Sequence, residues 1–171
     1  VELNGVRSVT SGYMGGHVKN PAYREVCNGT TGHAEVAQLK YDPLVVTLEM
    51  ILEVFWQTHD PTTLNRQGAD VGTQYRSAIF YHDQEQKRVA ENLRNELDKS
   101  GAFRSPIVTE IVPATDFYAA ENYHQDYYDL NGEQGYCCLL YTSDASEEGT
   151  SVELGGRRII KKKQNKRQGR S

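Results

Sequence analysis

Apolar and polar residues alternate along residues 33–41, where Ala37, Leu39 and Tyr41 share one face. The side chains of a strand point alternately to its two faces, so this period of two predicts a strand with its more apolar face turned to a core. Glu35 has the same parity as that face. The pattern therefore predicts a carboxyl group on the core side of a strand.

Apolar residues spaced three and four apart predict helices. Leu48, Ile51 and Phe55 share one side of a segment that opens with Asp-Pro, and proline is favoured in the first turn of a helix. Asp83 and Gln86 have the spacing of a capping box. In chain order we expect strands at residues 6–13, 33–41, 77–81 and 107–112, and helices at residues 42–58, 83–100 and 116–128.

These elements, separated by long loops, predict an α/β fold in which helices pack on a mixed sheet in two layers. One domain is expected over residues 1–138. After Cys138 the periodicity disappears, and a stretch rich in Ser, Glu and Gly leads into a basic end. Residues 139–171 are therefore expected to be a disordered tail that need not be native.

Composition and length suit a single globular domain. The chain has 171 residues, of which 37% are hydrophobic and 25% charged. No apolar run approaches the roughly 20 residues of a membrane span, so we expect a cytoplasmic monomer without a membrane partner. The chain starts at Val1 without an initiator methionine and shows no targeting leader, so we interpret its start as a truncation.

The charge is unevenly distributed. Net charge is −4, but residues 157–171 carry eight Lys and Arg and no acid, so the rest of the chain stands at −12. One hypothesis is therefore a nucleic-acid-binding module that uses the basic tail, and its binding would depend strongly on salt. The tail lacks interleaved aromatic residues and the acidic body repels phosphate, so we predict no nucleic-acid partner.

Glu35 is the first candidate for catalysis. Burial disfavours the charged form of a carboxyl group, so its pKa would rise and it could act as a general acid at neutral pH. Such an acid typically contributes about 10²–10⁴-fold when it protonates a developing oxyanion. The alternative is that Glu35, near the start of its strand, is partly solvated or salt-bridged and has no catalytic role.

A glycine-punctuated loop at residues 59–74 supplies further candidates. Asp70 lies there among other hydrogen-bonding side chains, and such loops often line sites, although loop Asp residues also commonly bond to their own backbone. Tyr23 and Tyr75 lie at loop edges, and a phenol can donate to an oxyanion. Because the chain has eleven tyrosines, most of them must serve packing.

Three cysteines are too few for the disulfide framework of a small secreted domain. Cys137 and Cys138 follow two nearby glycines, so at least one of these thiols can be presented to another site. A free thiol has a pKa of about 8.5, so little of it is thiolate at pH 7 without help from its surroundings. Cys27 is interpreted as a structural thiol.

No metal and no cofactor are expected. His33-Ala34-Glu35 matches half of a zinc-deaminase signature, but the chain has no Cys-x-x-Cys to complete it. The five histidines lack the spacing of a zinc site. Residues 12–16 are not the Gly-x-Gly-x-x-Gly of a dinucleotide loop.

Seven segments taken together resemble the A-type peptide methionine sulfoxide reductases. The likeness runs from about residue 5 to residue 137 and rests on Gly12-Tyr13-Met14-Gly15-Gly16, Asn20-Pro21-Ala22-Tyr23, Gly32-His33-Ala34-Glu35, Tyr41-Asp42-Pro43, residues 55–62, residues 65–77 and Tyr123-His124-Gln125. The resemblance implies a ferredoxin-like α/β sandwich. It also implies reduction of the S epimer of methionine sulfoxide, free or within proteins, for the repair of oxidised proteins.

The resemblance also implies roles for the candidate residues. Glu35 matches the acid that protonates the sulfoxide oxygen. Tyr23 and Tyr75 match the tyrosines that hold this oxygen, and Asp70 matches the aspartate that supports the site. Cys137 matches the resolving cysteine, which forms a disulfide that thioredoxin then reduces. The adjacent Cys138 leaves open which of the two thiols resolves.

The family's nucleophile is a cysteine in the motif Gly-Cys-Phe-Trp, which is absent from these 171 residues. By the resemblance it would lie shortly before Val1. No other candidate group supplies the nucleophilicity of a thiolate, so the chain alone is expected to bind sulfoxide weakly without turnover. A catalytically dead sulfoxide-binding protein is therefore a third hypothesis.

Overall fold

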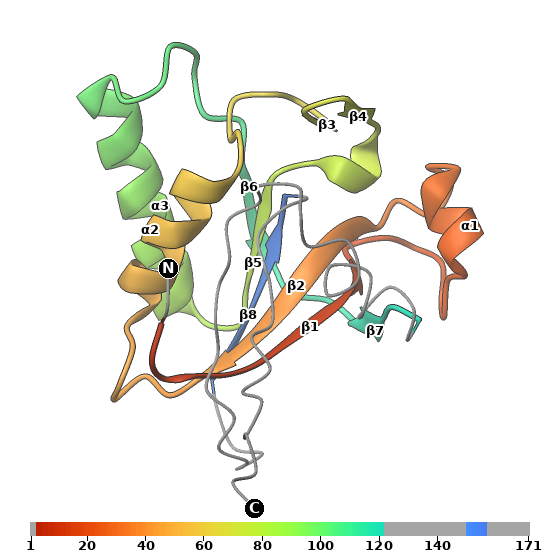
Figure 1. Cartoon of the computed structure of the whole chain (residues 1–171), viewed down its shortest axis with the longest axis horizontal. Coiled ribbons are helices and arrows are strands. Elements are labelled where there is room, and N and C mark those ends of the chain that lie inside the picture. Colours follow the sequence, from red (N-terminus) through yellow and green to blue (C-terminus); the bar gives the residue numbers. More distant parts are fainter. Residues whose placement is uncertain (1–2, 122–149, 157–171) are drawn as a thin grey trace, which may run out of the picture.

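The computed structural model describes residues 3–121 and 150–156 and has a two-layer α/β arrangement (Figure 1). Its main sheet has six strands in the order β6-β5-β8-β2-β1-β7. Neighbouring strands are antiparallel except β5 and β6, which are parallel, so the predicted mixed sheet is confirmed. The strands are β1 (Val6–Met14), β2 (Ala34–Tyr41), β5 (Ala78–Tyr81), β6 (Glu110–Pro113), β7 (Tyr118–Ala119) and β8 (Thr150–Gly155).

Two helices form the second layer. Figure 1 shows α2 (Leu48–Thr58) and α3 (Gln84–Ser100) side by side against the sheet, and the two helices contact each other. The main core lies between these helices and the sheet, where Leu39 of β2, Leu52 of α2 and Leu154 of β8 are fully buried. Leu39 belongs to the face that the alternation predicted to be apolar. The pattern of β2 thus identified the side of the sheet on which the helices pack.

The predicted start of α2 at residue 42 is wrong. The carboxylate of Asp42 accepts a hydrogen bond from the backbone N–H of Leu44 at 3.0 Å, which makes a turn in place of a first helical turn. The helix begins after Thr47, whose hydroxyl accepts a hydrogen bond from the backbone N–H of Met50. At α3 the predicted N-cap is confirmed, because the Asp83 carboxylate accepts from the N–H three residues later at 2.8 Å. The other half of the capping box is wrong, because the Gln86 side chain accepts from the N–H of His82 and not from that of Asp83.

The helix expected over residues 116–128 is wrong for the part that the structure describes. Tyr118 and Ala119 form β7, which pairs with β1 through the register Gly12↔Ala119. The N–H of Ala120 also donates to the carbonyl of Ser11 at 2.9 Å. Without β7, the edge of β1 would leave its backbone groups unpaired, and this long-range pairing outweighs the local helical spacing. Residues 122–128 lie outside the described residues.

The expectation of disorder after residue 138 is wrong for residues 150–155. They form β8, which lies between β2 and β5 and is antiparallel to both. Val152 and Leu154 point into the main core. The short alternation was hidden in a stretch rich in Ser, Glu and Gly, and pairing on both edges supplies the stabilisation that composition alone did not predict. The rest of residues 139–171 lies outside the described residues.

The remaining elements surround one end of the sheet. They are the short helix α1 (Tyr23–Cys27), the hairpin of β3 (Arg66–Gln67) and β4 (Asp70–Val71), and the 3-10 helix η1 (Thr73–Tyr75). Figure 1 shows them away from α2 and α3, around the end of β1 and the start of β2. Among the described residues, no helix is both long and apolar enough to cross a membrane.

Candidate active site

The register of β1 and β2 places Glu35 near the end of the sheet at which β1 finishes. Tyr13 is its partner across the strand pair, and Met14 pairs with Ala34. Glu35 is half-buried, whereas Ala37, which has the same parity, is buried beneath the helices. The sequence thus predicted the face of the Glu35 side chain correctly. Its place at the start of the strand leaves this carboxyl group only partly covered.

Tyr23 is the first residue of α1, which lies in the connection between β1 and β2. The Glu25 carboxylate folds back and accepts a hydrogen bond from the N–H of Ala22 at 2.8 Å, so the short helix has a local N-terminal cap. Val26 is fully buried and packs with Tyr13, which holds α1 against β1. The half-buried side chain of Tyr23 therefore starts from a backbone that is fixed on both sides.

Asp70 lies in an ordered hairpin, where the sequence predicted only a loop. Asn65 and Gly68 adopt positive φ angles of 50° and 57°, which lets the backbone turn tightly. The buried Gln67, the cross-strand partner of Asp70, donates to the carbonyl of Asp60 at 2.7 Å and accepts from its N–H. This amide ties the hairpin to the segment that follows α2.

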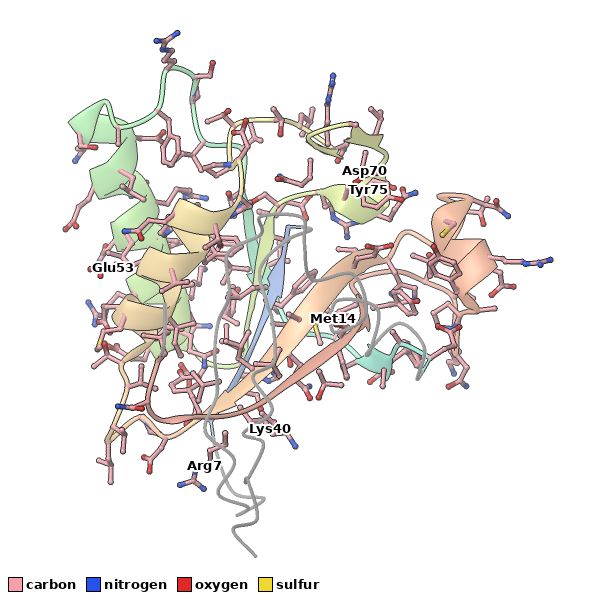
Figure 2. All side chains as sticks on the ribbon, in the orientation of Figure 1. Arg7, Met14, Lys40, Glu53, Asp70 and Tyr75 are labelled. Carbon is pink, nitrogen blue, oxygen red and sulfur yellow. The ribbon has the colours of Figure 1, made fainter. Side chains whose placement is uncertain are left out.

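Tyr75 ends η1, which follows the hairpin directly and contacts β2. Figure 2 labels Asp70 and Tyr75 in the same part of the view, beyond the start of β2. The neighbouring Gln74 donates a hydrogen bond from its amide to the carbonyl of Cys27 at 3.0 Å, which connects η1 with α1. The elements that carry Glu35, Tyr23, Asp70 and Tyr75 therefore meet at one end of the sheet.

Two residues at this end of the sheet were missed by sequence reasoning, Gln74 and Glu121. The carboxylate of Glu121 accepts hydrogen bonds from the Tyr13 hydroxyl at 3.2 Å and from the N–H of Tyr23 at 2.9 Å. Glu121 falls within the segment that was expected to be a helix. Its role depends on contacts with residues about 100 positions earlier, for which the sequence holds no local signal.

His59, directly after α2, has an unusual environment. The residue is half-buried, and desolvation lowers its pKa to about 4, although the hydrogen bond to the Phe55 carbonyl acts in the opposite direction. The other ring nitrogen lies 2.7 Å from the Ser77 hydroxyl, which in turn lies 2.7 Å from that of Thr109. His59 is therefore neutral at pH 7 and links the end of α2 to β5.

The sulfur residues of the prediction are only partly covered by the structure. Cys27 is half-buried at the end of α1 and is a free thiol. Cys137 and Cys138 lie outside the described residues. Within residues 3–121 and 150–156, no group of three or more His, Cys, Asp or Glu side chains could hold a metal ion.

A family model described as peptide methionine sulfoxide reductase matches residues 1–152. The chain belongs to the peptide methionine sulfoxide reductase family. The MsrA protein of Trichodesmium erythraeum is 54% identical over 133 residues, which make up 78% of this chain and 75% of that protein. The MsrA protein of Methanothermobacter thermautotrophicus is 58% identical over 130 residues, or 76% of this chain and 77% of that protein.

Two solved structures show the same fold. The reduced form of Mxr1 from Saccharomyces cerevisiae matches with a TM-score of 0.71 and 37% identity, covering 78% of this chain and 76% of that one. Methionine sulfoxide reductase A of Corynebacterium diphtheriae matches with a TM-score of 0.65 and 39% identity, covering 78% and 67%. The resemblance noted in the sequence is thus confirmed for the family and the fold, and the chain is a member of an oxidoreductase family.

Proposed function

We propose that this peptide methionine sulfoxide reductase reduces the S epimer of methionine sulfoxide, free or within oxidised proteins, with thioredoxin as the reductant in the cytoplasm. The observation that carries the proposal is the meeting of β2, α1, β4 and η1 at one end of the sheet. These elements carry Glu35, Tyr23, Asp70 and Tyr75, the four residues that match the family's site. An acid, two phenols and a supporting carboxylate suit a reaction in which an oxygen must be held and protonated.

In this proposal Glu35 supplies the proton. A thiol attacks the sulfoxide sulfur, and the oxygen that leaves that sulfur becomes basic as its bond weakens. Protonation by a neighbouring carboxylic acid lowers the barrier to this step. The half-buried position of Glu35 at the start of β2 combines partial desolvation with access from outside, and a proton donor needs both.

Tyr23 and Tyr75 hold the same oxygen. Each hydroxyl can donate one hydrogen bond, and the two residues start from α1 and η1, which are joined through Gln74. Donors fixed before the substrate binds stabilise developing charge without further reorganisation. Asp70, in the hairpin just before η1, supports this side of the site.

The net step moves oxygen from methionine sulfoxide to the thiol, so that methionine is formed and the thiol becomes a sulfenic acid. A second thiol condenses with the sulfenic acid, releases water and forms a disulfide. We assign this resolving role to Cys137 or Cys138. Thioredoxin then reduces the disulfide by thiol exchange and becomes oxidised itself.

The nucleophile is the one part of this chemistry that the 171 residues do not supply in the family's motif. Gly-Cys-Phe-Trp does not occur in them. A hydroxyl or carboxylate is a poor substitute for a thiolate at sulfur. We therefore expect the 171-residue chain to bind sulfoxide without turnover, and an extended chain with this motif before Val1 to be active.

The test compares the 171-residue chain with the extended chain in an assay that measures the conversion of each epimer of a methionine sulfoxide peptide to the reduced peptide, with thioredoxin present. The extended chain should reduce the S epimer only. Glu35→Gln should lower its rate by about 100-fold, while the exposed Glu96→Gln serves as a matched control and should leave the rate unchanged. Activity of the extended chain no greater than that of its Glu35→Gln variant would contradict the proposal.

A further inference from the structure

Gln74 joins the two elements that carry the phenols. Its amide nitrogen donates to the carbonyl of Cys27 at 3.0 Å. Cys27 is the last residue of α1, which begins with Tyr23, and Gln74 directly precedes Tyr75 in η1. The Gln74 side chain thus connects η1 with α1, although Gln74 and Cys27 are 47 positions apart in the sequence.

The hydrogen bond satisfies a group that the short helix cannot satisfy itself. The last carbonyls of a helix have no partner within it. Three of those in α1 are taken locally, since the N–H groups of Asn28 and Gly29 donate to the carbonyls of Arg24 and Val26, and the Thr30 hydroxyl donates to that of Glu25. The carbonyl of Cys27 instead receives the Gln74 amide. Because a carbonyl only accepts, this contact also fixes which end of the amide faces α1.

The packing around Gln74 holds its amide in place. The side chain is 5% exposed, although Thr73 before it is exposed and Tyr75 after it is half-buried. Gly72 has a φ of 150°, and a Cβ at this position would lie 2.2 Å from the Gln74 Oε1 atom. Gly29, with a φ of 71°, approaches the same oxygen from the side of α1. The glycine at residue 72 therefore leaves the room that this amide occupies, whereas a Cβ at residue 29 would lie at 3.6 Å, an ordinary van der Waals distance.

An apolar side chain of similar size would avoid an unpaired oxygen at this position but would lose the hydrogen bond to the Cys27 carbonyl. The Oε1 atom is buried and has no hydrogen-bond partner among the described residues. Leaving a buried acceptor unpaired is unfavourable. The amide also forms the hydrogen bond to α1, and this bond fixes the position of η1 relative to α1.

We propose that Gln74 is a positioning residue, which sets the separation of the Tyr23 and Tyr75 hydroxyls by tying η1 to α1. The inference rests on the proposed function, in which both hydroxyls bind the sulfoxide oxygen. A pair of donors stabilises one oxygen only when both reach it at about 2.7–3.1 Å. Loss of the link leaves both phenols in the protein but lets their separation vary.

The test measures binding, which does not require the nucleophile. N-acetylmethionine-S-sulfoxide methylamide is titrated into the 171-residue chain, and the dissociation constant is obtained by NMR. Gln74→Met keeps the volume and removes the donor, and it should weaken binding about fivefold. Gln86→Met is the matched control: Gln86 is also buried and donates to a backbone carbonyl, that of Ser151 at 2.9 Å, but it lies at the start of α3.

Gln74→Glu separates positioning from general stability. A glutamic acid can donate to the Cys27 carbonyl only when protonated, and burial favours that form. The Gln74→Glu variant should therefore bind the sulfoxide about as tightly as the unmodified chain at pH 5. At pH 8 it should bind several-fold more weakly than the unmodified chain does. Gln74→Met should show no such recovery at low pH. Melting temperatures of all variants are measured in parallel.

Double variants identify the groups on which Gln74 acts. If Gln74 positions the phenols, adding Gln74→Met to Tyr23→Phe or Tyr75→Phe should cost less than it does alone. Unchanged affinity of Gln74→Met, or fully additive losses, would overturn the inference while leaving the proposed function standing. Failure of Tyr23→Phe and Tyr75→Phe to weaken binding at all would instead count against the proposed function.

Discussion

The N–H of Tyr23 donates a hydrogen bond to the Glu121 carboxylate at 2.9 Å, across 98 positions of the chain. The other oxygen of this carboxylate accepts from the Tyr13 hydroxyl. Tyr13 lies opposite Glu35 in the β1–β2 register. One carboxylate therefore joins the helix that carries a proposed oxygen-binding phenol to the strand pair that carries the proposed acid.

Glu121→Ala should destabilise the protein by about 1–2 kcal/mol, because two donors lose a charged acceptor in a partly buried position. Glu121→Gln should cost less, since its oxygen can still accept from Tyr23 while its nitrogen faces the Tyr13 hydroxyl. Urea unfolding of both variants measures the difference. Equal costs for the two would show that the hydrogen bonds are not what Glu121 contributes.

His59 predicts how stability depends on pH. Its pKa is about 4 in the folded protein and near 6.5 when unfolded, so between these values the unfolded chain binds a proton that the folded one does not. The free energy of unfolding is therefore highest above pH 6.5. It falls by up to about 3 kcal/mol as the pH decreases to about 4, because protonation of His59 stabilises the unfolded chain over this range.

His59→Phe should flatten this part of the profile, whereas His17→Asn, at an exposed position, should leave it unchanged. The free energy of unfolding is measured at intervals from pH 4 to pH 8. A profile of His59→Phe with the slope of the unmodified protein would assign the pH dependence to other groups.

Gly12→Ala should displace β7. A Cβ at residue 12 would lie 2.4 Å from the Phe117 ring and 2.5 Å from the carbonyl oxygen of Tyr118, so backbone as well as side chain would have to move. We expect a loss of about 1–3 kcal/mol in unfolding free energy. Gly101→Ala has open space and carries only the strain of a φ of 70°, about 1 kcal/mol. A smaller loss for Gly12→Ala than for Gly101→Ala would contradict the close packing of β7 on β1.

Leu154→Ala tests whether β8 belongs to the folded domain. Leu154 is 1% exposed in the main core, so its truncation should cost about 2–5 kcal/mol. Thr150→Ala, at the partly exposed start of the same strand, should cost much less. Thermal or urea unfolding provides the comparison. If both variants unfold like the unmodified chain, residues 150–155 contribute nothing to the stability of the sheet.

Much of the fold could be predicted because its elements bury one face each. Alternation along residues 33–41 gave β2 and the face on which Glu35 lies, and the spacing of Leu48, Ile51 and Phe55 gave α2. Such patterns are local, since they record which side of a segment is covered. They do not record which hydrogen bonds form at the ends of a segment, so the start of α2, which is set by hydrogen bonds at Asp42 and Thr47, was misplaced.

β7, β8 and the connections around the site were decided by long-range contacts. Tyr118 and Ala119 are extended because β1 offers them unpaired backbone groups, and residues 150–155 are a strand because β2 and β5 pair with both of their edges. In the same way, Gln74 and Glu121 have no local signature. The sequence contains the residue types that are needed to hold and protonate an oxygen. Their convergence at one site depends on backbone groups that form hydrogen bonds only once the sheet has formed.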